Sequence, residues 1–290
     1  MFYSPLRYPG GKGKLAPFME LMIDELGHRG GTYIEPFAGG AGIAIELLER
    51  NVVGQIVIND YDKGVWSFWK AILSETDRFV ECLNNVPLTV EEWNRQRKIC
   101  LTQNKKYSFQ LGFATFYMNR TNRSGIIKGG IIGGLNQTGN WKMDARFNQE
   151  ELSQRITNIA ARKGDIKLYN KEIGSFIKTY IPKYEENALI YFDPPYFGKG
   201  KQLYMNFFNL KDHERIEAAI RNSVNGDWII TYDDAPEIAH IYDGYSVRKF
   251  DLNYSVANKR RASELMFFKN GIAIPSNMLL EENRIAINLR

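Results

Sequence analysis

One strand–loop–helix–strand run near the N-terminus constrains the fold more than any other feature of this sequence. TYIEPFAGG, residues 32–40, reads as a short apolar strand that runs into a glycine loop. AGIAIELLERN, residues 41–51, has helical spacing, and QIVIND, residues 55–60, is a second apolar strand that ends on Asn59 and Asp60. This order predicts a βαβ unit and therefore an α/β fold with a mostly parallel central sheet and helices on both faces.

The same alternation returns in the C-terminal half of the chain. Helices are predicted at residues 150–164, 174–184, 212–224 and 235–244, and strands at 165–170, 188–193, 227–234, 246–254 and 264–271. Between the halves, residues 63–85 read as helix and 125–141 as a glycine-rich loop or hairpin. Because long structureless loops are uncommon, we expect an inserted recognition subdomain, mainly helical, at residues 66–148. It would interrupt a discontinuous α/β domain of residues 1–65 and 149–290.

The composition excludes several classes of protein. With 44% hydrophobic residues among 290, the chain should fold, and no run of about 18 apolar residues or secretory signal is present, so we expect a cytoplasmic protein. Cys82 and Cys100 give no disulfide framework, and His28, His213 and His240 lack metal-ligand spacing. We expect these side chains to be structural or exposed, and we expect no metal site.

Basic residues gather in the middle of the sequence. Between Trp93 and Asn148 there are ten basic residues and one acidic residue, Asp144, although the net charge of the whole chain is only +5. The ten are Arg95, Arg97, Lys98, Lys105, Lys106, Arg120, Arg123, Lys128, Lys142 and Arg146. A basic region within a mildly acidic frame favours contact with a polyanion, and we expect nucleic acid to bind here.

The glycine loop and Asp60 together suit a nucleoside-bearing cofactor. In open parallel sheets, ligands bind beyond the carboxyl ends of strands, and EPFAGGAG, residues 35–42, lies there. Its glycines permit close approach of the backbone, and Asp60 stands near the spacing at which an acid accepts ribose hydroxyls. NAD is disfavoured because isoleucine replaces the third glycine of its fingerprint. ATP is disfavoured because GGKGKL, residues 10–15, lacks a Ser or Thr after its lysine.

A second segment, LIYFDPPYFG at residues 189–198, ends an apolar strand on an acid, two prolines and an aromatic residue. Pro194 and Pro195 cannot donate hydrogen bonds, so the backbone carbonyls of Asp193 and Pro194 are left to accept. With the Asp193 carboxylate, they suit a planar heterocycle that carries an exocyclic amino group and stacks on Tyr196. The alternative interpretation is a tight turn after a strand.

Such acceptors would also have a chemical effect. Accepting both amino protons favours a pyramidal nitrogen whose lone pair can attack, and the Asp193 carboxylate would stabilise the positive charge that develops and help to remove the proton. The electrophile consistent with the glycine loop and Asp60 is the sulfonium of S-adenosylmethionine. This assignment requires Asp193 to face the pocket beside Asp60 and not to be buried in a salt bridge.

Several motifs together resemble the Dam-type adenine-specific DNA methyltransferases. They are RYPGGKGKL (7–15), YIEPFAGGAG (33–42), INDYD (58–62), FYMNRTNRSG (116–125) and FDPPY (192–196), in that family's order and over most of the chain. The resemblance implies a Rossmann-like methyltransferase fold, S-adenosylmethionine as cofactor, and methyl transfer to the amino group of an adenine flipped out of double-stranded DNA. The transfer scheme itself needs no metal.

The resemblance assigns residues to roles. It implies that Tyr8, Lys12, Glu35, Phe37, Ala38, Gly39, Gly40, Asp60 and Asp193 bind the cofactor, and that Asp193, Pro194, Pro195 and Tyr196 form the catalytic segment. It implies that Arg120, Arg123, Ser124, Gly125 and Lys128 lie on the DNA-reading surface. Relatives often carry an aromatic residue or asparagine shortly before this glycine, whereas this chain has Arg123 and Ser124. The recognised DNA sequence therefore cannot be copied from a relative.

Other interpretations stay open. An amine methyltransferase acting on cytosine, RNA or a protein amide would use similar acceptors, and a non-catalytic DNA-binding relative or an NAD oxidoreductase is less well supported. Asp233 or Asp234 is predicted to be a helix N-cap, and Trp66, Phe68 and Trp69 to be core residues. Trp141 and Tyr117 could each be core or base-stacking, and the basic run at residues 259–261 could contact phosphate or be a solvated loop.

Overall fold

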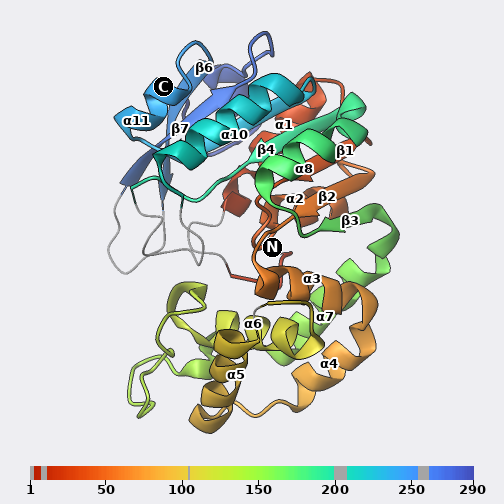
Figure 1. The fold of residues 1–290 in the computed structure, drawn as a ribbon, viewed down its shortest axis with the longest axis vertical. Coiled ribbons are helices and arrows are strands. Elements are labelled where there is room, and N and C mark those ends of the chain that lie inside the picture. The colour runs from red at the N-terminus through yellow and green to blue at the C-terminus, as the bar shows by residue number, and fades with distance from the viewer. Residues whose placement is uncertain (1–2, 8–11, 104, 199–207, 254–260) are drawn as a thin grey trace.

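The computed structural model describes residues 3–7, 12–103, 105–198, 208–253 and 261–290. Figure 1 shows a sheet flanked by helices in the upper part of the molecule and a separate group of helices below it. Three residues named in the sequence predictions, Tyr8, Lys259 and Arg260, lie outside these ranges, and the side chain of Arg261 is not described either.

A sheet of seven strands, counted over the described ranges, forms the centre of the upper part. The strands are β1 (Thr32–Glu35), β2 (Gln55–Asn59), β3 (Ile166–Tyr169), β4 (Ala188–Phe192), β5 (Asp227–Asp233), β6 (Ser246–Asn253) and β7 (Arg261–Phe268). Their order across the sheet is β3-β2-β1-β4-β5-β7-β6. The pairs from β3 to β5 are parallel, whereas β7 is antiparallel to both β5 and β6. The predicted mostly parallel sheet is confirmed.

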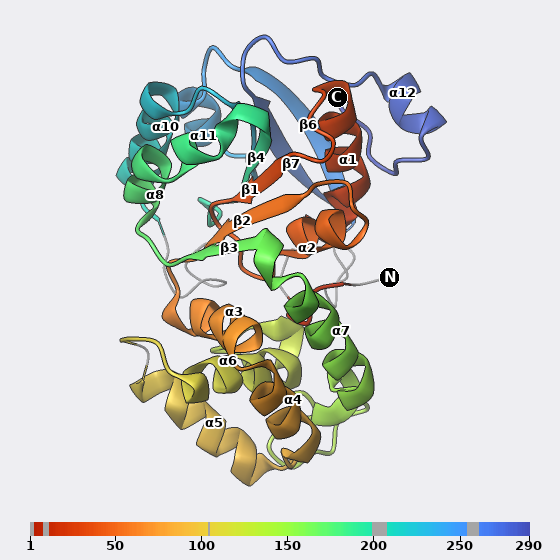
Figure 2. The same ribbon diagram turned by 90° about the vertical axis from the view of Figure 1, so that its right-hand side faces the viewer.

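The sheet is buried on both faces, which explains its apolar strands. Every residue of β4 is buried. Tyr33 and Ile34, which are adjacent on β1, belong to the hydrophobic clusters on opposite faces, as the two-residue repeat of a strand requires. Helices α1 (Ala16–Glu25) and α2 (Gly42–Glu49) cover one face, and α8 (Ile173–Thr179), α10 (Leu210–Ser223) and α11 (Pro236–Ile241) cover the other. Figure 2 shows these two groups on either side of the strands.

The lower part is helical in its described residues. It contains α3 (Lys63–Ser74), α4 (Thr76–Asn85), α5 (Val90–Thr102), α6 (Phe109–Thr121) and α7 (Gln149–Ala161). Helix α6 lies at the centre of this group and is almost wholly buried. Helix α3 approaches it so closely that a Cβ at Gly112 would lie 2.5 Å from the carbonyl oxygen of Ser67. Stacked Phe68 and Phe116 fill the contact, with ring centroids 5.8 Å apart.

Polar side chains fix where several of these helices begin. Asp62 caps α3, Thr89 caps α5, Ser108 caps α6 and Asn148 caps α7, in each case by accepting a backbone N–H of the first turn. Asn209 forms a capping box with Asp212 at the start of α10.

Short elements complete the chain. They are the 3₁₀ turns η1 (Lys12–Leu15), η2 (Arg123–Gly125), η3 (Met143–Arg146), η4 (Lys163–Asp165), η5 (Ile181–Lys183) and η6 (Glu185–Asn187), and helix α12 (Asn277–Glu282). Apart from η2 and one isolated bridge between Asn122 and Ile131, residues 122–142 form neither helix nor strand, as the glycine-rich sequence predicts. At the sheet edge, the backbones of Lys249 and Arg290 exchange two hydrogen bonds.

The limits of the helical group differ from the predicted ones. Helix α7 packs against α4 and α3, so the helical group extends on both sides of the predicted limits 66–148, and those limits stay a prediction. None of the helices in the described residues is long and apolar enough to cross a membrane.

Candidate functional site

The strand order reverses between β1 and β4, and at such a point an open α/β sheet forms a crevice at the carboxyl ends of its strands. From β1 the chain moves outward to β2 and β3, then returns to β4 beside β1 and continues to β5. The connecting helices therefore lie on opposite faces at this point, and the carboxyl ends of β1 and β4 border the crevice in which open α/β sheets bind ligands. The glycine loop follows β1 and Asp193 follows β4, as predicted.

The glycine loop is held by neighbouring elements. Gly39 and Ala41 both have positive φ, 48° and 44°, so the chain turns sharply into α2. The Gly39 N–H donates to Asp60 Oδ2 at 2.8 Å, and the Gly39 carbonyl accepts from Trp69 Nε1 at 2.9 Å. Ser4 donates to the carbonyl of Gly40. The loop is thus tied to β2, to α3 and to the N-terminal segment.

Both carboxylate oxygens of Asp60 accept backbone hydrogen bonds, and one of them comes from the glycine loop. Its Oδ2 accepts from Gly39, and its Oδ1 accepts the backbone N–H of Asp62 at 2.8 Å. Each oxygen keeps a second lone pair, so the carboxylate can still accept a hydroxyl. Burial raises the pKa of Asp60 to about 7, and the charge of Asp62 acts in the same direction.

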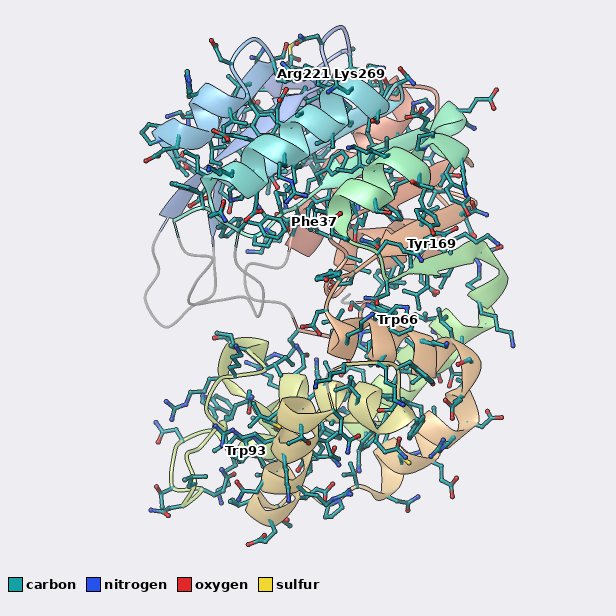
Figure 3. The ribbon with its side chains drawn as sticks, viewed as in Figure 1. Phe37, Trp66, Trp93, Tyr169, Arg221 and Lys269 are labelled. Carbon is teal, nitrogen blue, oxygen red and sulfur yellow. The ribbon has the colours of Figure 1, made fainter. Side chains whose placement is uncertain are left out.

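Glu35 lies at the end of β1, where it accepts the backbone N–H of Ala44 in the first turn of α2 at 3.2 Å. Its side chain is buried. Burial raises the pKa of Glu35 to about 8, with a further contribution from the charge of Asp193. The other predicted loop residues lie beside it: Ala38 donates its N–H to the Asn59 carbonyl at 3.0 Å, and the half-buried ring of Phe37 meets Phe208 edge-on at 6.0 Å. Figure 3 labels Phe37 on the side of the sheet that faces the helical group.

Asp193 is only partly buried and forms a long ion pair with Lys12, whereas its position relative to Asp60 stays a prediction. Its Oδ1 accepts from Thr231 Oγ1 at 3.2 Å and lies 3.7 Å from Lys12 Nζ, and 27% of its side-chain surface stays accessible. The close ion pair of Lys12 is made with Glu264 instead. Burial raises the pKa of Asp193, and the charge of Lys12 opposes that rise. The carboxylate is therefore polarised by Lys12 without being closed in a tight salt bridge.

Lys12 and Tyr196 differ from expectation. The Lys12 ammonium is buried among Asp193, Glu264 and Thr231, and lies 5.4 Å from the centroid of the Tyr196 ring. Tyr196 donates its hydroxyl to Glu264 Oε1 at 3.0 Å, and only 7% of the residue is exposed. The ring therefore does not present an open face for a stacked base in this structure, contrary to the sequence-based expectation.

Asp233 holds the turn that follows the prolines. Its carboxylate accepts the backbone N–H groups of Phe197 at 2.9 Å and Gly198 at 2.8 Å. The prediction that Asp233 or Asp234 caps a helix is wrong: Ala235 is the N-cap of α11, without a side-chain bond, and Asp234 pairs with Lys249. Pro194 is buried and Pro195 half-buried, and the described hydrogen bonds of this turn use neither the Asp193 nor the Pro194 carbonyl.

The predicted DNA-reading residues divide into two groups. Arg123, Ser124 and Lys128 are exposed. Arg120 is only 8% exposed, and its guanidinium donates to the carbonyls of Arg146 at 2.7 Å and Pro5 at 3.5 Å. Burial lowers its pKa to about 9. The expectation that Arg120 lies on a DNA-reading surface is wrong, because the side chain joins α6 to the N-terminal segment.

Gly125 is also buried. Its φ is +74°, and a Cβ there would lie 2.4 Å from the carbonyl oxygen of Arg7. Asn119 donates to that same carbonyl and to the carbonyl of Gly125. Much of the FYMNRTNRSG motif therefore binds the N-terminal segment to the helical group, and Gly125 contributes through its backbone.

The two aromatic residues that could be core or base-stacking, Tyr117 and Trp141, differ in burial. Tyr117 is buried in the core. Trp141 is 73% exposed and lies in the same irregular segment as the exposed Lys128 and Lys142. Phe68 and Trp69 are core residues as predicted. Trp66, also predicted to be a core residue, is instead only half-buried, with the ammonium groups of Lys63 and Lys70 over its ring at 5.3 and 5.2 Å. Figure 3 labels it on α3, below the sheet.

Cysteine and histidine side chains play structural parts. Cys100 is buried and Cys82 half-buried, both as free thiols. His213 is buried beside Tyr232, with Nδ1 3.1 Å from its hydroxyl. No cluster of potential metal ligands occurs among the residues that the structure describes.

Sequence reasoning missed three side chains at the site. Thr231 and Asp233 lie on β5, and Glu264 lies on β7. Thr231 donates to Asp193, Asp233 accepts from Phe197, and Glu264 accepts from Tyr196. An acid within the apolar run ELMFF was a signal for Glu264, and an acid at the end of an apolar strand was a signal for Asp233.

This sheet order, with an antiparallel β7 beside β5 and an acid–diproline turn at the crevice, defines a Rossmann-like α/β fold. The chain belongs more narrowly to the D12 class N6 adenine-specific DNA methyltransferase family, whose model matches residues 8–256. It is a DNA methyltransferase of the adenine-specific class.

Individual relatives are distant. The Type II methyltransferase M.MjaIII of Methanocaldococcus jannaschii is 21% identical over 277 residues, which cover 84% of this chain and 89% of the relative. Among solved structures, the rRNA methyltransferase aviRa of Streptomyces viridochromogenes matches with a TM-score of 0.40 and 13% identity, covering 90% of this chain and 86% of its own. A SAM-dependent methyltransferase from Agrobacterium tumefaciens matches with a TM-score of 0.39 and 11% identity, covering 88% and 62%.

Proposed function

We propose that this protein transfers a methyl group from S-adenosylmethionine to the exocyclic amino group of an adenine that has been flipped out of double-stranded DNA. The observation that carries the proposal is the position of Asp193. Its partly accessible carboxylate stands at the carboxyl end of β4, next to the glycine loop of β1, in the crevice of the sheet. Family membership supports adenine as the target.

The charges around the crevice fit a cationic cofactor. Glu35, Asp60, Asp193 and Glu264 are acids at or near the ends of adjacent strands, and Lys12 is the cation in contact with two of them. The raised pKa values of Glu35 and Asp60 show that negative charge at these positions is costly without a counter-charge. A ligand with a sulfonium and an ammonium group would favour their ionised forms. When bound, S-adenosylmethionine supplies an electrophilic methyl group.

We assign the cofactor to the loop Glu35–Gly40 and to Asp60. The glycine loop has the backbone conformation that lets a ligand approach closely, and Asp60 retains lone pairs for ribose hydroxyls. Lys12 belongs to this proposal in a changed role, because its ammonium faces Asp193 and Glu264 and acts on the cofactor site through them. The assignment of Tyr8 stays a prediction.

Asp193 is proposed to act on the target amine. One amino N–H would be accepted by the carboxylate and the other by the Pro194 carbonyl, which orients the nitrogen lone pair toward the methyl group. As positive charge develops on the nitrogen, the carboxylate stabilises it at short range. The raised pKa of Asp193 makes it a better acceptor for the proton that leaves.

DNA is proposed to bind along the exposed basic face of the helical group. Arg123, Lys128 and Lys142 are exposed in the segment that follows α6, together with Ser124 and the indole of Trp141. Lysine and arginine would neutralise phosphates, and an exposed aromatic ring could stack on a base. Extrusion of a base costs a few kcal/mol, which these contacts must offset. In this proposal residues 66–148 form the recognition subdomain, and residues 1–65 and 149–290 form the catalytic domain.

A substrate panel tests the proposal. The purified protein is incubated with S-adenosylmethionine labelled in its methyl group and with duplex DNA, RNA or a protein extract, and the modified product is digested and identified. We expect label only in DNA, as N6-methyladenine. Label in cytosine, in RNA or in protein would overturn the substrate assignment, and label transferred equally by Asp193→Ala would overturn the catalytic one.

A further inference from the structure

Glu264 is a buried acid next to the site, and it lies outside the residues 8–256 that the family model matches. It stands on the antiparallel strand β7, opposite Asp233 of β5. Only 1% of the residue is exposed. A fully buried carboxyl group is costly unless its environment supplies donors, so its partners indicate what it does.

The partners of Glu264 are themselves site residues. Lys12 contacts its Oε2, and Tyr196 donates to its Oε1 at 3.0 Å. The same Lys12 ammonium is 3.7 Å from Asp193 Oδ1 and 3.5 Å from Thr231 Oγ1. One cation therefore lies between two carboxylates, and it is closer to Glu264 than to Asp193.

We propose that Glu264 is a positioning residue for methyl transfer: it holds the Lys12 ammonium back from Asp193 and fixes the ring of Tyr196, so that Asp193 keeps its capacity to accept the target amine. This inference rests on the proposed role of Asp193. It assigns a function to a strand that the recognised motifs do not include.

The physical reason is competition for one positive charge. If Glu264 became neutral, Asp193 would be the nearest carboxylate to Lys12, and an opposite charge at close range lowers a carboxyl pKa by about 1 to 3 units. An Asp193 engaged fully by an ammonium would be a weaker acceptor for the amine. The titratable groups that interact electrostatically with Asp193 are Lys12, Tyr33, Glu35, Tyr191, Tyr232 and Glu264, of which Lys12 lies within ion-pair distance.

The first experiment compares Glu264→Gln with Glu217→Gln. Glu217 is also a buried acid, but it lies on α10 at the opposite face of the sheet, where it pairs with Arg221 and Tyr245. For Glu264→Gln we expect kcat at neutral pH to fall by about tenfold or more, KM for DNA and cofactor to change by less than about threefold, and the acidic limb of the kcat profile to move about one pH unit lower. Glu217→Gln should keep the limb of the parent protein.

Two further variants separate positioning from folding. Glu264→Asp retains the charge and should return the acidic limb toward its original position. If Glu264 acts through Lys12, then adding Glu264→Gln to Lys12→Met should lower kcat much less than it does in the parent protein. A Glu264→Gln enzyme with kcat within about twofold of the parent, or a lower kcat without a shifted limb, would overturn the inference.

Asp193→Ala distinguishes the two levels of the account. If Asp193→Ala is inactive and Glu264→Gln is normal, the positioning role fails and the proposed function stands. If Asp193→Ala is active, the proposed catalytic role fails and the positioning role fails with it.

Discussion

Replacing Asp233 by alanine removes the side chain that holds the turn after Pro194 and Pro195. The carboxylate accepts two backbone N–H groups, from Phe197 and Gly198, and hydrogen bonds to a charged acceptor are worth about 1.5 to 3 kcal/mol each. Gly198 is exposed, so water would replace part of its bond. We therefore take the net loss for the turn held by Asp233 as about 2 kcal/mol, which lowers the equilibrium constant between its held and released forms about thirtyfold.

The assay is single-turnover methylation of duplex DNA with labelled cofactor. Asp233→Ala should lower the rate by up to about thirtyfold, and Asp233→Asn, which keeps an acceptor but loses the charge, should fall between that variant and the parent. Cofactor binding measured by calorimetry should change by less than about threefold, since Asp233 makes no described contact with the glycine loop.

The neighbouring residue provides a matched control. Asp234 pairs with the exposed Lys249 at 2.9 Å, and exposed ion pairs contribute about 0 to 1 kcal/mol. Asp234→Ala should therefore methylate DNA like the parent protein. Equal rates for Asp233→Ala and Asp234→Ala would refute the reasoning.

Three further predictions follow from burial and charge. Because the pKa of Glu35 is about 8 in the folded chain and 4.5 ordinarily, the folded state binds a proton that the unfolded chain has lost, so the free energy of unfolding should fall as pH rises from 4.5 to about 8. Urea titrations should show a flatter dependence for Glu35→Gln, and a rise over this range that Glu35→Gln leaves unchanged would contradict the burial argument. Arg120→Met should lower the free energy of unfolding by about 1 to 3 kcal/mol per carbonyl left unpaired and leave the salt slope of DNA binding unchanged, whereas Lys128→Ala should reduce that slope by about one. Trp141→Ala should leave thermal unfolding unchanged because the indole is exposed, but weaken DNA binding by about 1 to 3 kcal/mol, and unaltered affinity would place the DNA surface elsewhere.

The sheet could be predicted from the sequence because its strands carry strong local signals. The apolar run at residues 188–193 corresponds to β4 (Ala188–Phe192), and that at 227–234 corresponds to β5 (Asp227–Asp233). Both runs end on an acid where the chain leaves the buried sheet. The glycine loop and Asp193 therefore came together at one edge without any information about tertiary contacts.

The polar contacts within the site could not be predicted in the same way. Glu264 and Lys12 are 252 residues apart, and nothing local in either segment indicates that they meet. Asp233 looked like a helix cap because a helix follows it, but the nearby turn after Pro195 offers two N–H groups to the same carboxylate. In such cases the tertiary fold decides which of several possible donors an acid meets.

Arg120 shows the limit of reasoning from charge. A basic residue in a basic segment is equally compatible with an exposed and a buried position, and the carbonyls that bind Arg120 belong to residues 26 and 115 positions away. Arg123 and Lys128, in the same segment, are exposed because the chain leaves α6 before reaching them.

The most direct test of the central claim is the rate of methyl transfer by Asp193→Ala under single-turnover conditions, measured beside its equilibrium affinity for duplex DNA and for the cofactor. The account predicts that transfer falls by about a thousandfold or more while both affinities stay within a few-fold of the parent protein. Methyl transfer at the parental rate would contradict it, because the carboxylate at the end of β4 would then not be the group that acts on the amine.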